Sequence, residues 1–234
     1  MENNYDNDTL YTPALEDKEH ILYDGATISL TGGAQQFYEM MQNRRSIRSF
    51  KPLPIPSIDV IKKCIMAAGT APSGAHTEPW TFCIIKSNKI KQRLREIVEF
   101  EEELNYTQRM NRQWTTDLRP LKTNFIKPYI TDAPYIIAIF KQIYGFTKNG
   151  NRKQHYYNEI SVSIATGILL CALQSAGLCS LITTPLNCGP SIRNILKRPS
   201  NEKLLVLIPV GYPADECWIP DLKRKSLNDI MTIH

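Results

Sequence analysis

The sequence predicts an α+β protein, because helices and strands alternate along the chain without a regular βαβ rhythm. Amphipathic stripes typical of helices and short apolar runs typical of strands follow one another at irregular intervals. No GxGxxG fingerprint follows a predicted strand, which argues against a doubly wound nucleotide-binding sheet. The 234 residues suffice for one substantial core, so we expect a single domain after an N-terminal arm.

The N-terminal region is predicted to be an arm followed by one short helix. Residues 1–33 lack periodicity, and we expect them to form a flexible arm. The apolar spacing in QQFYEMMQ predicts a helix over about 34–43. Three prolines between residues 52 and 56 force an extended connector, because proline fixes φ and restricts the residue before it.

The next three elements are predicted from caps and periodicity. Ser57 is expected to cap a helix that stops at Gly69. The β-branched, apolar run WTFCIIK at 80–86 predicts a strand. Residues 88–113 are predicted to form one charged amphipathic helix, and a polar segment covers 115–132.

The C-terminal half is predicted to be strand, loop, helix and two further strands. The continuous apolar run at 135–141 indicates a buried strand, and residues 145–153 read as a loop. Residues 155–177 predict one long helix that is apolar nearly all round, which is typical of a core or a subunit interface. Strands are expected at 178–184 and 203–212.

Composition narrows the possible partners. A net charge of +5 suits an anionic ligand such as a phosphate and is too small to indicate nucleic acid. Six cysteines without a CxxC pair and four scattered histidines predict reduced thiols and no metal centre. The longest apolar stretch, 160–173, is too short to cross a bilayer. We therefore expect a soluble, cytoplasmic protein without membrane contact, or the soluble part of a membrane-anchored parent.

The motif RRSIR concentrates positive charge within five residues. Arg44, Arg45 and Arg48 supply three guanidinium groups, and Ser46 supplies a hydroxyl. Arginine grips phosphates in a bidentate manner, so this motif is a candidate anion site. Arg224, in the sequence KRK, is a second candidate for the same phosphate. A solvated basic turn is the alternative for both.

A second group of polar residues suits a zwitterionic ligand. Glu102 and Tyr106 are spaced i,i+4 and share one helix face, and Lys127 follows 21 residues later. A carboxylate, a phenol and an ammonium together would match an amino acid, with its carboxylate on lysine and its ammonium on glutamate. The alternative is a charged face in water.

The loop TAPSGAHTEPW at 70–80 has few reactive side chains. Gly74 permits close approach to the backbone, and exposed N–H groups can cradle an anion. We therefore expect this loop to act through its main chain and through Ser73, while His76 reads as structural. Threonines at 183 and 184 end a strand, where a hydroxyl can donate to a ring nitrogen or simply cap the strand.

Taken together, RRSIR, TAPSGAHTEPWTF, EEELNYTQRM, HYYNEISVSIATGILL, TTPLNCGP and PDLKRK resemble the iodotyrosine deiodinase branch of the flavin-dependent nitroreductase family. The resemblance runs from about residue 36 to the end of the chain. It implies a nitroreductase-like fold: a mixed, mostly antiparallel sheet flanked by helices, in an intertwined homodimer. It also implies that 34–234 form an FMN-binding catalytic domain with the cofactor at the subunit interface.

The resemblance assigns roles to individual residues. The implied FMN-binding set is Arg44, Arg45, Ser46, Ile47, Arg48, Ser73, Ile182, Thr183, Thr184 and Arg224. Thr184 matches the threonine that hydrogen-bonds flavin N5 and favours one-electron steps. The Ala75 main-chain N–H matches the donor to the substrate phenolate. The implied substrate-binding set is Ala75, Glu102, Tyr106 and Lys127.

The activity implied by the resemblance is reductive dehalogenation. Mono- and diiodotyrosine, and other halotyrosines, would be converted to tyrosine plus halide. NADPH would supply the electrons, either directly or through a separate reductase. Two alternatives stay open: a general FMN nitroreductase or quinone reductase, and a flavoprotein that binds halotyrosine without turning it over.

Overall fold

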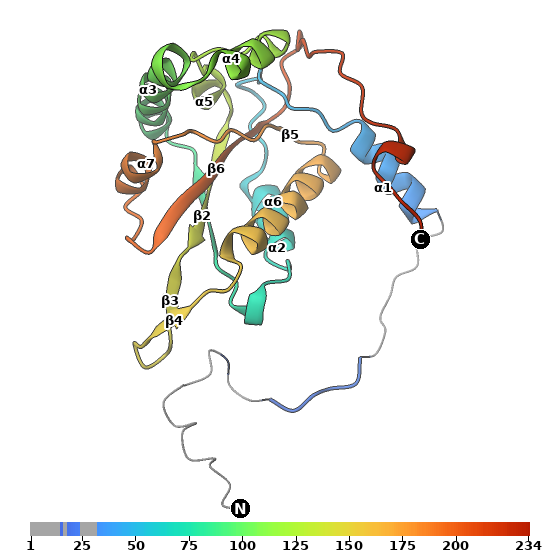
Figure 1. The fold of residues 1–234 in the computed structure, drawn as a ribbon, viewed down its shortest axis with the longest axis vertical. Helices are drawn as coiled ribbons and strands as arrows, with labels where there is room; N and C mark the ends of the chain where they lie inside the picture. Colours follow the sequence, from blue (N-terminus) through green and yellow to red (C-terminus); the bar gives the residue numbers. More distant parts are fainter. Residues whose placement is uncertain (1–14, 16–17, 24–31) are drawn as a thin grey trace, which may run out of the picture.

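A four-stranded antiparallel sheet with helices on both faces forms the centre of the protein in a computed structural model (Figure 1). The structure describes residue 15, residues 18–23 and residues 32–234, so the predicted arm lies largely outside the described residues. The strand order is β1–β2–β6–β5. The strands are β1 (Trp80–Ile85), β2 (Tyr135–Gln142), β5 (Cys179–Ser180) and β6 (Glu202–Gly211). The α+β prediction is confirmed.

Strand β2 is buried on both sides, which explains its continuous apolar sequence. Its side chains alternate with a period of two, as the pleat requires. Ile137 and Ile139 face one apolar cluster, whereas Ala138 and Phe140 face the other. The sheet is therefore the middle layer of three.

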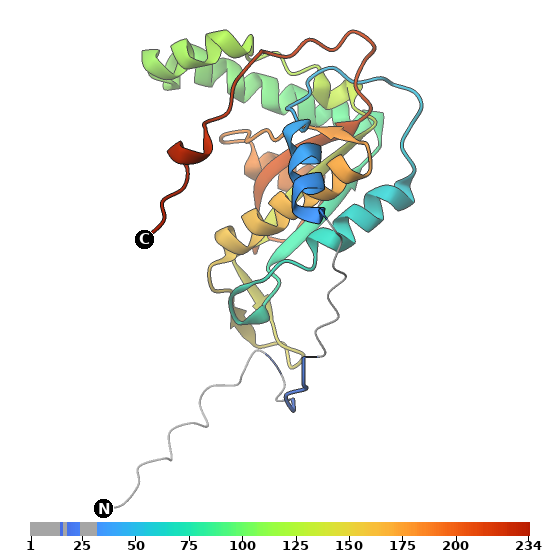
Figure 2. The ribbon, with the colours of Figure 1, turned by 90° about the vertical axis from the view of Figure 1, so that its right-hand side faces the viewer.

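Helices α2 (Ile58–Ala68) and α6 (Asn158–Ser175) cover one face of the sheet (Figures 1 and 2). The Ser57 side chain caps α2 by accepting from the Asp59 N–H, and Gly69 follows its last residue, as predicted. Leu169 and Leu173 of α6 are fully buried against this face. Each such side chain contributes about 1.5–3 kcal/mol of burial energy.

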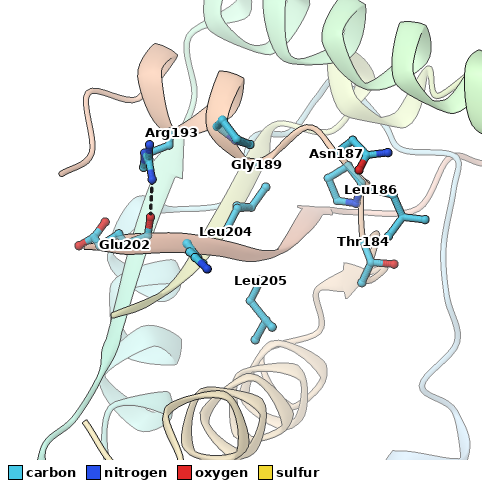
Figure 3. Close-up of a pocket in the computed structure, with 11 residues that line it drawn as sticks. Thr184, Leu186, Asn187, Gly189, Arg193, Glu202, Leu204 and Leu205 are labelled. Carbon is cyan, nitrogen blue, oxygen red and sulfur yellow. Dashed lines mark hydrogen bonds between the residues drawn. The ribbon is translucent and has the colours of Figure 1, made fainter. Parts of the chain in front are cut away.

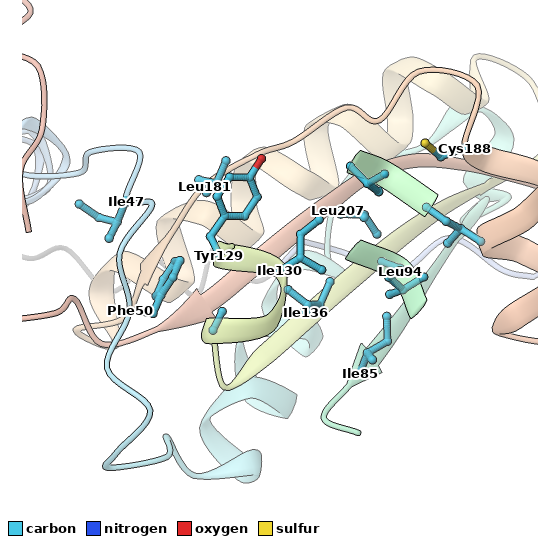
Figure 4. Close-up of a cluster of buried hydrophobic side chains, with 14 of the residues drawn as sticks. Ile47, Phe50, Ile85, Leu94, Tyr129, Ile130, Ile136, Leu181, Cys188 and Leu207 are labelled. Carbon is cyan, nitrogen blue, oxygen red and sulfur yellow. The ribbon is translucent and has the colours of Figure 1, made fainter. Parts of the chain in front are cut away.

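Helices α3 (Asn88–Leu104), α5 (Tyr129–Asp132) and α7 (Gly189–Ile195) cover the opposite face. Figure 4 shows the core between them, where Leu94, Ile130 and Leu207 meet. Ile47 and Phe50, from the segment after helix α1 (Gly33–Gln42), close one side of this core.

Two segments extend from this body. Helix α1 (Gly33–Gln42) and the tail after residue 212 lie on the same side of the body in Figure 1, and Arg224 of the tail donates to the Gln42 main-chain oxygen at the end of α1. Both carry exposed apolar side chains, including Phe37 on α1 and Trp218 and Ile230 in the tail.

Four predicted boundaries are corrected by the structure. The predicted helix 88–113 ends at Leu104, because a π turn (η3, Asn105–Arg109) and an extended Met110 follow it. The predicted loop 145–153 is mostly a hairpin of β3 (Tyr144–Phe146) and β4 (Arg152–Gln154). An aromatic pair, Tyr144 with Phe146, and the Arg152 guanidinium over the Tyr144 ring stabilise it.

The other two corrections concern the C-terminal half. Helix α6 begins at Asn158 rather than 155, because Tyr157 adopts a left-handed conformation. The predicted strand 178–184 is regular only at Cys179–Ser180. Beyond it, one isolated bridge between Thr183 and Leu207 continues the pairing.

Candidate active site

A pocket of about 220 Å³ opens between the end of α3, the segment before α5 and the chain after β5. We call it the clamp pocket, since it contains the predicted zwitterion-binding residues. Of the predicted site residues, the following line it: Arg48, Glu102, Tyr106, Lys127, Ile182, Thr183 and Thr184. The structure thus brings together residues that lie up to 136 positions apart in the chain, from Arg48 to Thr184.

An ion pair is buried in this pocket. The Lys127 ammonium lies 3.4 Å from the Glu102 carboxylate, and these residues are only 5% and 8% exposed. Burial lowers the pKa of Lys127, and the negative charge of Glu102 opposes that shift. The ammonium also lies 5.4 Å from the Tyr106 ring centroid, in a cation–π contact. The alternative of a solvated charged face is therefore excluded.

A second layer of hydrogen bonds fixes the main chain of Lys127. Its N–H donates to Glu99 Oε1 at 2.6 Å, and Arg95 Nε donates to the same oxygen at 2.7 Å. The Lys127 side chain also donates to the main-chain oxygen of Asn124. These contacts hold the lysine in place without ligand.

Residues 105–127 form a helical cover over the pocket, which we call the lid. It starts with the π turn after Leu104, and helix α4 (Arg112–Leu118) follows. The Asn111 side chain caps α4 by accepting from the Trp114 N–H at 2.8 Å. Trp114 lines the pocket and is 46% exposed.

Two phenols in the pocket are protonated at neutral pH. Burial raises the pKa of Tyr129 to about 12, and its hydroxyl lies 3.5 Å from Thr183 Oγ1. Burial also raises the pKa of Tyr106, and the Glu102 charge adds to that shift. Neither tyrosine can act as a phenolate base at neutral pH.

A basic pocket of about 370 Å³ adjoins the clamp pocket, and Arg48 lines both. The other predicted phosphate-binding residues line it as well: Arg44, Arg45, Ser46 and Arg224. Arg224 reaches back from the tail and donates to the main-chain oxygens of Gln42 and Arg44 at 3.0 and 2.9 Å. Positive charge at the end of α1 is favourable, because helix carbonyls converge there.

Ile47 has a different environment from its neighbours. Its side chain is buried in the core, and its N–H donates to the Ser180 oxygen at 3.1 Å. The structure places Ile47 in neither pocket. It anchors the arginine segment to the end of β5 through the Ser46–Ser180 bridge.

The 182–184 segment is held by the sheet. Thr183 and Leu207 exchange two main-chain hydrogen bonds of 2.9 Å. This bridge fixes the backbone on either side of Thr183, so that Ile182 and Thr184 both reach the clamp pocket.

A separate pocket of about 360 Å³ lies between α7 and β6 (Figure 3). Two of its charged groups are bound to the protein: Arg193 donates to the Glu202 main-chain oxygen at 3.3 Å, and the Glu202 carboxylate pairs with Arg198. The third, Lys203, is exposed. Thr184 and Leu186 line both this pocket and the clamp pocket. We assign the chemistry to the clamp pocket, because it contains the buried Glu102–Lys127 pair and most of the predicted site residues.

The 70–80 loop has a strained backbone. Ala75, His76 and Glu78 all have positive φ, near +47°. Such conformations cost L-residues about 1–3 kcal/mol each and cluster at functional sites. Thr77 stabilises the turn by donating from its hydroxyl to the Gly74 oxygen at 3.0 Å.

The turn presents main-chain donors. Gly74 and Ala75 open a 3₁₀ turn, where N–H groups have no partner within the helix. A Cβ on Gly74 would lie 2.8 Å from the Tyr156 oxygen, so only glycine permits this close packing. The Ser73 hydroxyl accepts from the Glu78 N–H at 3.0 Å, which leaves its own hydrogen free to donate.

Within the chain, this loop is remote from the other predicted site residues. Gly74 packs on Tyr156, just before α6, whereas the arginine segment bonds to Ser180, just after it (Figures 1 and 2). The 18 residues of α6 span about 27 Å. In the described part of the chain, Ser73 and Ala75 line neither the clamp pocket nor the basic pocket.

Several pocket residues were missed from sequence. Lys223 lines the basic pocket next to Arg224, and its place in KRK was a usable signal. Met110, Trp114 and Tyr129 line the clamp pocket. Their contribution depends on the helix break at Met110 and on the fold, neither of which periodicity reveals.

Comparison with known proteins decides the family. A model of the nitroreductase family matches residues 41–212, which is well over half of the chain. The chain is also 62% identical over 220 residues to an iodotyrosine deiodinase of Drosophila melanogaster, covering 94% of this chain and 77% of that protein.

The chain belongs to the iodotyrosine deiodinase branch of the nitroreductase family.

Other members of this branch are similarly related. Iodotyrosine deiodinase 1 of Homo sapiens is 58% identical over 198 residues, covering 85% of this chain and 68% of that protein. A crystal structure of oxidized iodotyrosine deiodinase bound to FMN and 3-iodo-L-tyrosine superposes with a TM-score of 0.72 and 29% identity. It covers 82% of this chain and 96% of that one. The nitroreductase-like fold predicted from the motifs is confirmed.

The described residues show neither a metal centre nor a helix that could span a membrane. Among them, no group of three or more histidine, cysteine, aspartate or glutamate residues is arranged to hold a metal ion. Within the same residues, no helix combines the length and hydropathy that crossing a membrane requires.

Proposed function

We propose that this protein catalyses the FMN-dependent reductive dehalogenation of iodotyrosines and other halotyrosines to tyrosine plus halide. The observation that carries the proposal is the buried Glu102–Lys127 pair, which lines the clamp pocket beside Arg48 and next to the basic pocket. Relatives at 62% and 58% identity are iodotyrosine deiodinases, which supports the same reading.

The two adjoining pockets fit FMN. The basic pocket offers guanidinium groups at Arg44, Arg45 and Arg224 for a phosphate, and Ser46 adds a hydroxyl donor. The clamp pocket offers Thr183 and Thr184 hydroxyls beside an apolar wall, which suits a flat ring with polar edges. A crystal structure in the same branch contains FMN.

Glu102 and Lys127 would bind the amino-acid end of the substrate. The substrate ammonium would take the place of the Lys127 ammonium on Glu102, and Lys127 would turn to the substrate carboxylate. Each buried charge keeps a partner throughout, which matters because an unpaired buried charge is costly. A ligand with only one of the two charges would leave either Glu102 or Lys127 uncompensated.

The reaction consumes two electrons and one proton per halide released. FMN, when bound, supplies the electrons. We assign Thr184 the hydrogen bond to the flavin, from a backbone that the Thr183–Leu207 bridge holds still. The lid would exclude water from the aromatic ring through Trp114 and Leu118.

The Ala75 N–H would bind the substrate phenolate. An ortho halogen lowers the phenol pKa below the usual value of about 10, so more of a halotyrosine than of tyrosine is ionised. A strained turn with free N–H groups is preorganised to receive that anion. Ser73 is assigned to the cofactor from the same turn.

This assignment requires a second copy of the chain. Ser73 and Ala75 lie about one helix length from the arginine segment of their own protomer, as described above. Helix α6 carries an exposed stripe at helical spacing, formed by Ile160, Ile164 and Gly167. Two antiparallel α6 helices in a twofold dimer would place the loop of one protomer beside the pockets of the other.

The extended segments support the same homodimer. Phe37 of α1 and Trp218 and Ile230 of the tail are more than half exposed in one protomer. Intertwining with a second copy would bury these apolar side chains. It would also join residues 34–234 of two chains into one catalytic unit.

The electron source and location also belong to the proposal. NADPH, directly or through a reductase, is the donor we expect. A cytoplasmic location, a membrane-anchored parent and the lack of nucleic-acid partners stay predictions. Fractionation of the native protein and reduction assays with NADPH, with and without a reductase, test them.

One anaerobic experiment separates this function from its alternatives. The FMN-loaded protein is reduced with dithionite and mixed with one equivalent of 3-iodotyrosine. We expect one equivalent of iodide and of tyrosine, with the flavin reoxidised. Flavin that stays reduced without iodide release would identify a binding protein. A nitroarene that is reduced faster than iodotyrosine, in parallel assays, would identify a general nitroreductase.

A further inference from the structure

A buried amide stands beside the clamp and has no role in the function described so far. Asn105 is only 2% exposed and begins the π turn of the lid. Its Nδ2 donates to Glu102 Oε1 at 3.3 Å. The other carboxylate oxygen, Oε2, is the one that faces Lys127. The two oxygens of Glu102 are therefore divided between an amide and an ammonium.

The same amide is tied to the outer side of the lid. Asn105 Oδ1 accepts from Arg109 Nη1 at 3.2 Å, and that nitrogen also donates to Glu101 Oε2 at 2.6 Å. The Met110 N–H donates to the Asn105 main-chain oxygen at 2.8 Å, an i+5 bond that closes the π turn. An unbroken chain of contacts thus runs from Glu101 through Arg109 and Asn105 to Glu102.

We propose that Asn105 is a positioning residue that orients Glu102 toward the substrate ammonium and couples this orientation to the lid through Arg109. The inference rests on the proposed function and adds a residue to it. The observation that carries the inference is that each Glu102 oxygen has its own partner, Asn105 at Oε1 and Lys127 at Oε2. When Lys127 turns to the substrate carboxylate, Asn105 continues to donate to Oε1 of Glu102, and Oε2 accepts from the substrate ammonium.

The chemistry of the amide suits this task. A carboxylate accepts hydrogen bonds at both oxygens, and a neutral N–H donor fixes its plane without neutralising its charge. A lysine or arginine at this position would compete with the substrate ammonium. An aspartate would repel Glu102. Asparagine therefore leaves the full negative charge of Glu102 to the ligand.

The test compares two ligands that differ only at the ammonium. Calorimetric titration of the FMN-loaded protein with 3-iodotyrosine measures binding with the ammonium present. Titration with 3-(4-hydroxy-3-iodophenyl)propionate measures binding without it. We expect Asn105→Leu to weaken iodotyrosine binding about 10-fold, the usual effect of losing a hydrogen bond to a charged group. Affinity for the propionate should stay within about 2-fold of wild type.

A double-variant cycle and a lid control sharpen the test. In a Glu102→Gln background, Asn105→Leu should have no further effect on iodotyrosine binding, because the residue acts through Glu102. Asn111→Ala removes the cap of α4 and loosens the lid without touching Glu102. It should weaken both ligands by the same factor.

Each outcome of these titrations either supports or overturns the positioning role of Asn105. Equal weakening of both ligands by Asn105→Leu, or unchanged iodotyrosine binding, overturns the inference. If that variant does not fold or bind FMN, Arg109→Met replaces it, since the Arg109 side chain is 44% exposed. A smaller loss of about 3-fold, confined to iodotyrosine, is then expected, and an unselective or absent loss overturns the inference. A wild-type protein that does not bind iodotyrosine overturns the proposed function itself.

Discussion

The Lys127 ammonium lies 3.4 Å from the Glu102 carboxylate, and both groups are nearly removed from water. The clamp is thus already an ion pair before a ligand arrives. Removing one member of such a pair leaves the other as an uncompensated buried charge, which is more harmful than replacing both.

Lys127→Met is expected to raise KM for iodotyrosine about 100-fold, in line with the loss of one partner of a buried charge pair. Steady-state assays measure KM, and flavin absorbance after gel filtration shows that FMN stays bound. The matched control is Arg112→Met, which removes an exposed charge from the same lid. Unchanged saturation kinetics in the lysine variant would contradict the clamp assignment.

Thr184→Ala is expected to shift the flavin toward two-electron chemistry. The hydroxyl is assigned to the flavin. Without it, the reduction potential for the first electron should fall relative to the potential for the second, which disfavours single-electron transfer. Redox titration with halotyrosine bound measures both potentials. Iodide release should fall while nitroarene reduction persists. Potentials identical to those of the wild type would remove Thr184 from this role.

Ile164→Lys is expected to separate the proposed dimer. Ile164 belongs to the exposed stripe of α6, and a charge in the centre of an apolar interface is strongly unfavourable. Sedimentation velocity should show a dimer for the wild type and a monomer that has lost FMN for the variant. Phe100→Lys, at an exposed apolar position on α3, serves as the control and should stay dimeric. A wild-type monomer that retains FMN would refute the dimer.

His155→Leu is expected to reduce acid sensitivity. His155 is buried, and neither ring nitrogen has a hydrogen-bond partner within the described part of the chain. Burial lowers its pKa below the usual value of about 6.5, and the charge of Lys153 adds to this effect.

The sign of the pH effect follows from the lowered pKa. The folded protein keeps this imidazole neutral, so its stability is fully present above the unfolded value of about 6.5 and falls as pH drops below it. Urea unfolding at pH 7.5 and 5.5 measures the difference. The wild type should lose more stability than His155→Leu over this interval, whereas His234→Leu, at the exposed C-terminus, should match the wild type. Equal losses of stability in all three proteins would rule out His155 as a source of the acid sensitivity.

Elements with local signals were predicted well. The limits of α2 were predicted correctly because Ser57 is a typical side-chain cap and Gly69 a typical helix stop, and both can be recognised in the sequence. The apolar run of β2 identified a strand buried on both faces. The π turn after Leu104 has no such signal, because the charged periodicity of α3 continues through it. The β3–β4 hairpin is stabilised by an aromatic pair within β3 and a cross-strand cation–π contact, which its loop-like composition does not indicate.

The sequence identified many individual residues of the candidate site but not how the fold brings them together. Glu102 and Tyr106 line one pocket, but Tyr106 lies in the π turn beyond α3, and the burial of their contacts with Lys127 depends on the lid. Asn105 falls within the predicted helix 88–113 and has no signal of its own in the sequence, since its contacts exist only in the π turn. No sequence pattern reveals that Ala75 lies at the far end of α6 from the arginine segment.

That placement of Ala75 has a genetic consequence. In the paired arrangement proposed above, each reaction centre takes its lid from one polypeptide and its phenolate-binding turn from the other. Two inactive alleles, one damaged at Lys127 and one damaged at the turn, would then rescue each other when co-expressed. Their mixed assembly would contain one centre carrying both lesions and one carrying neither.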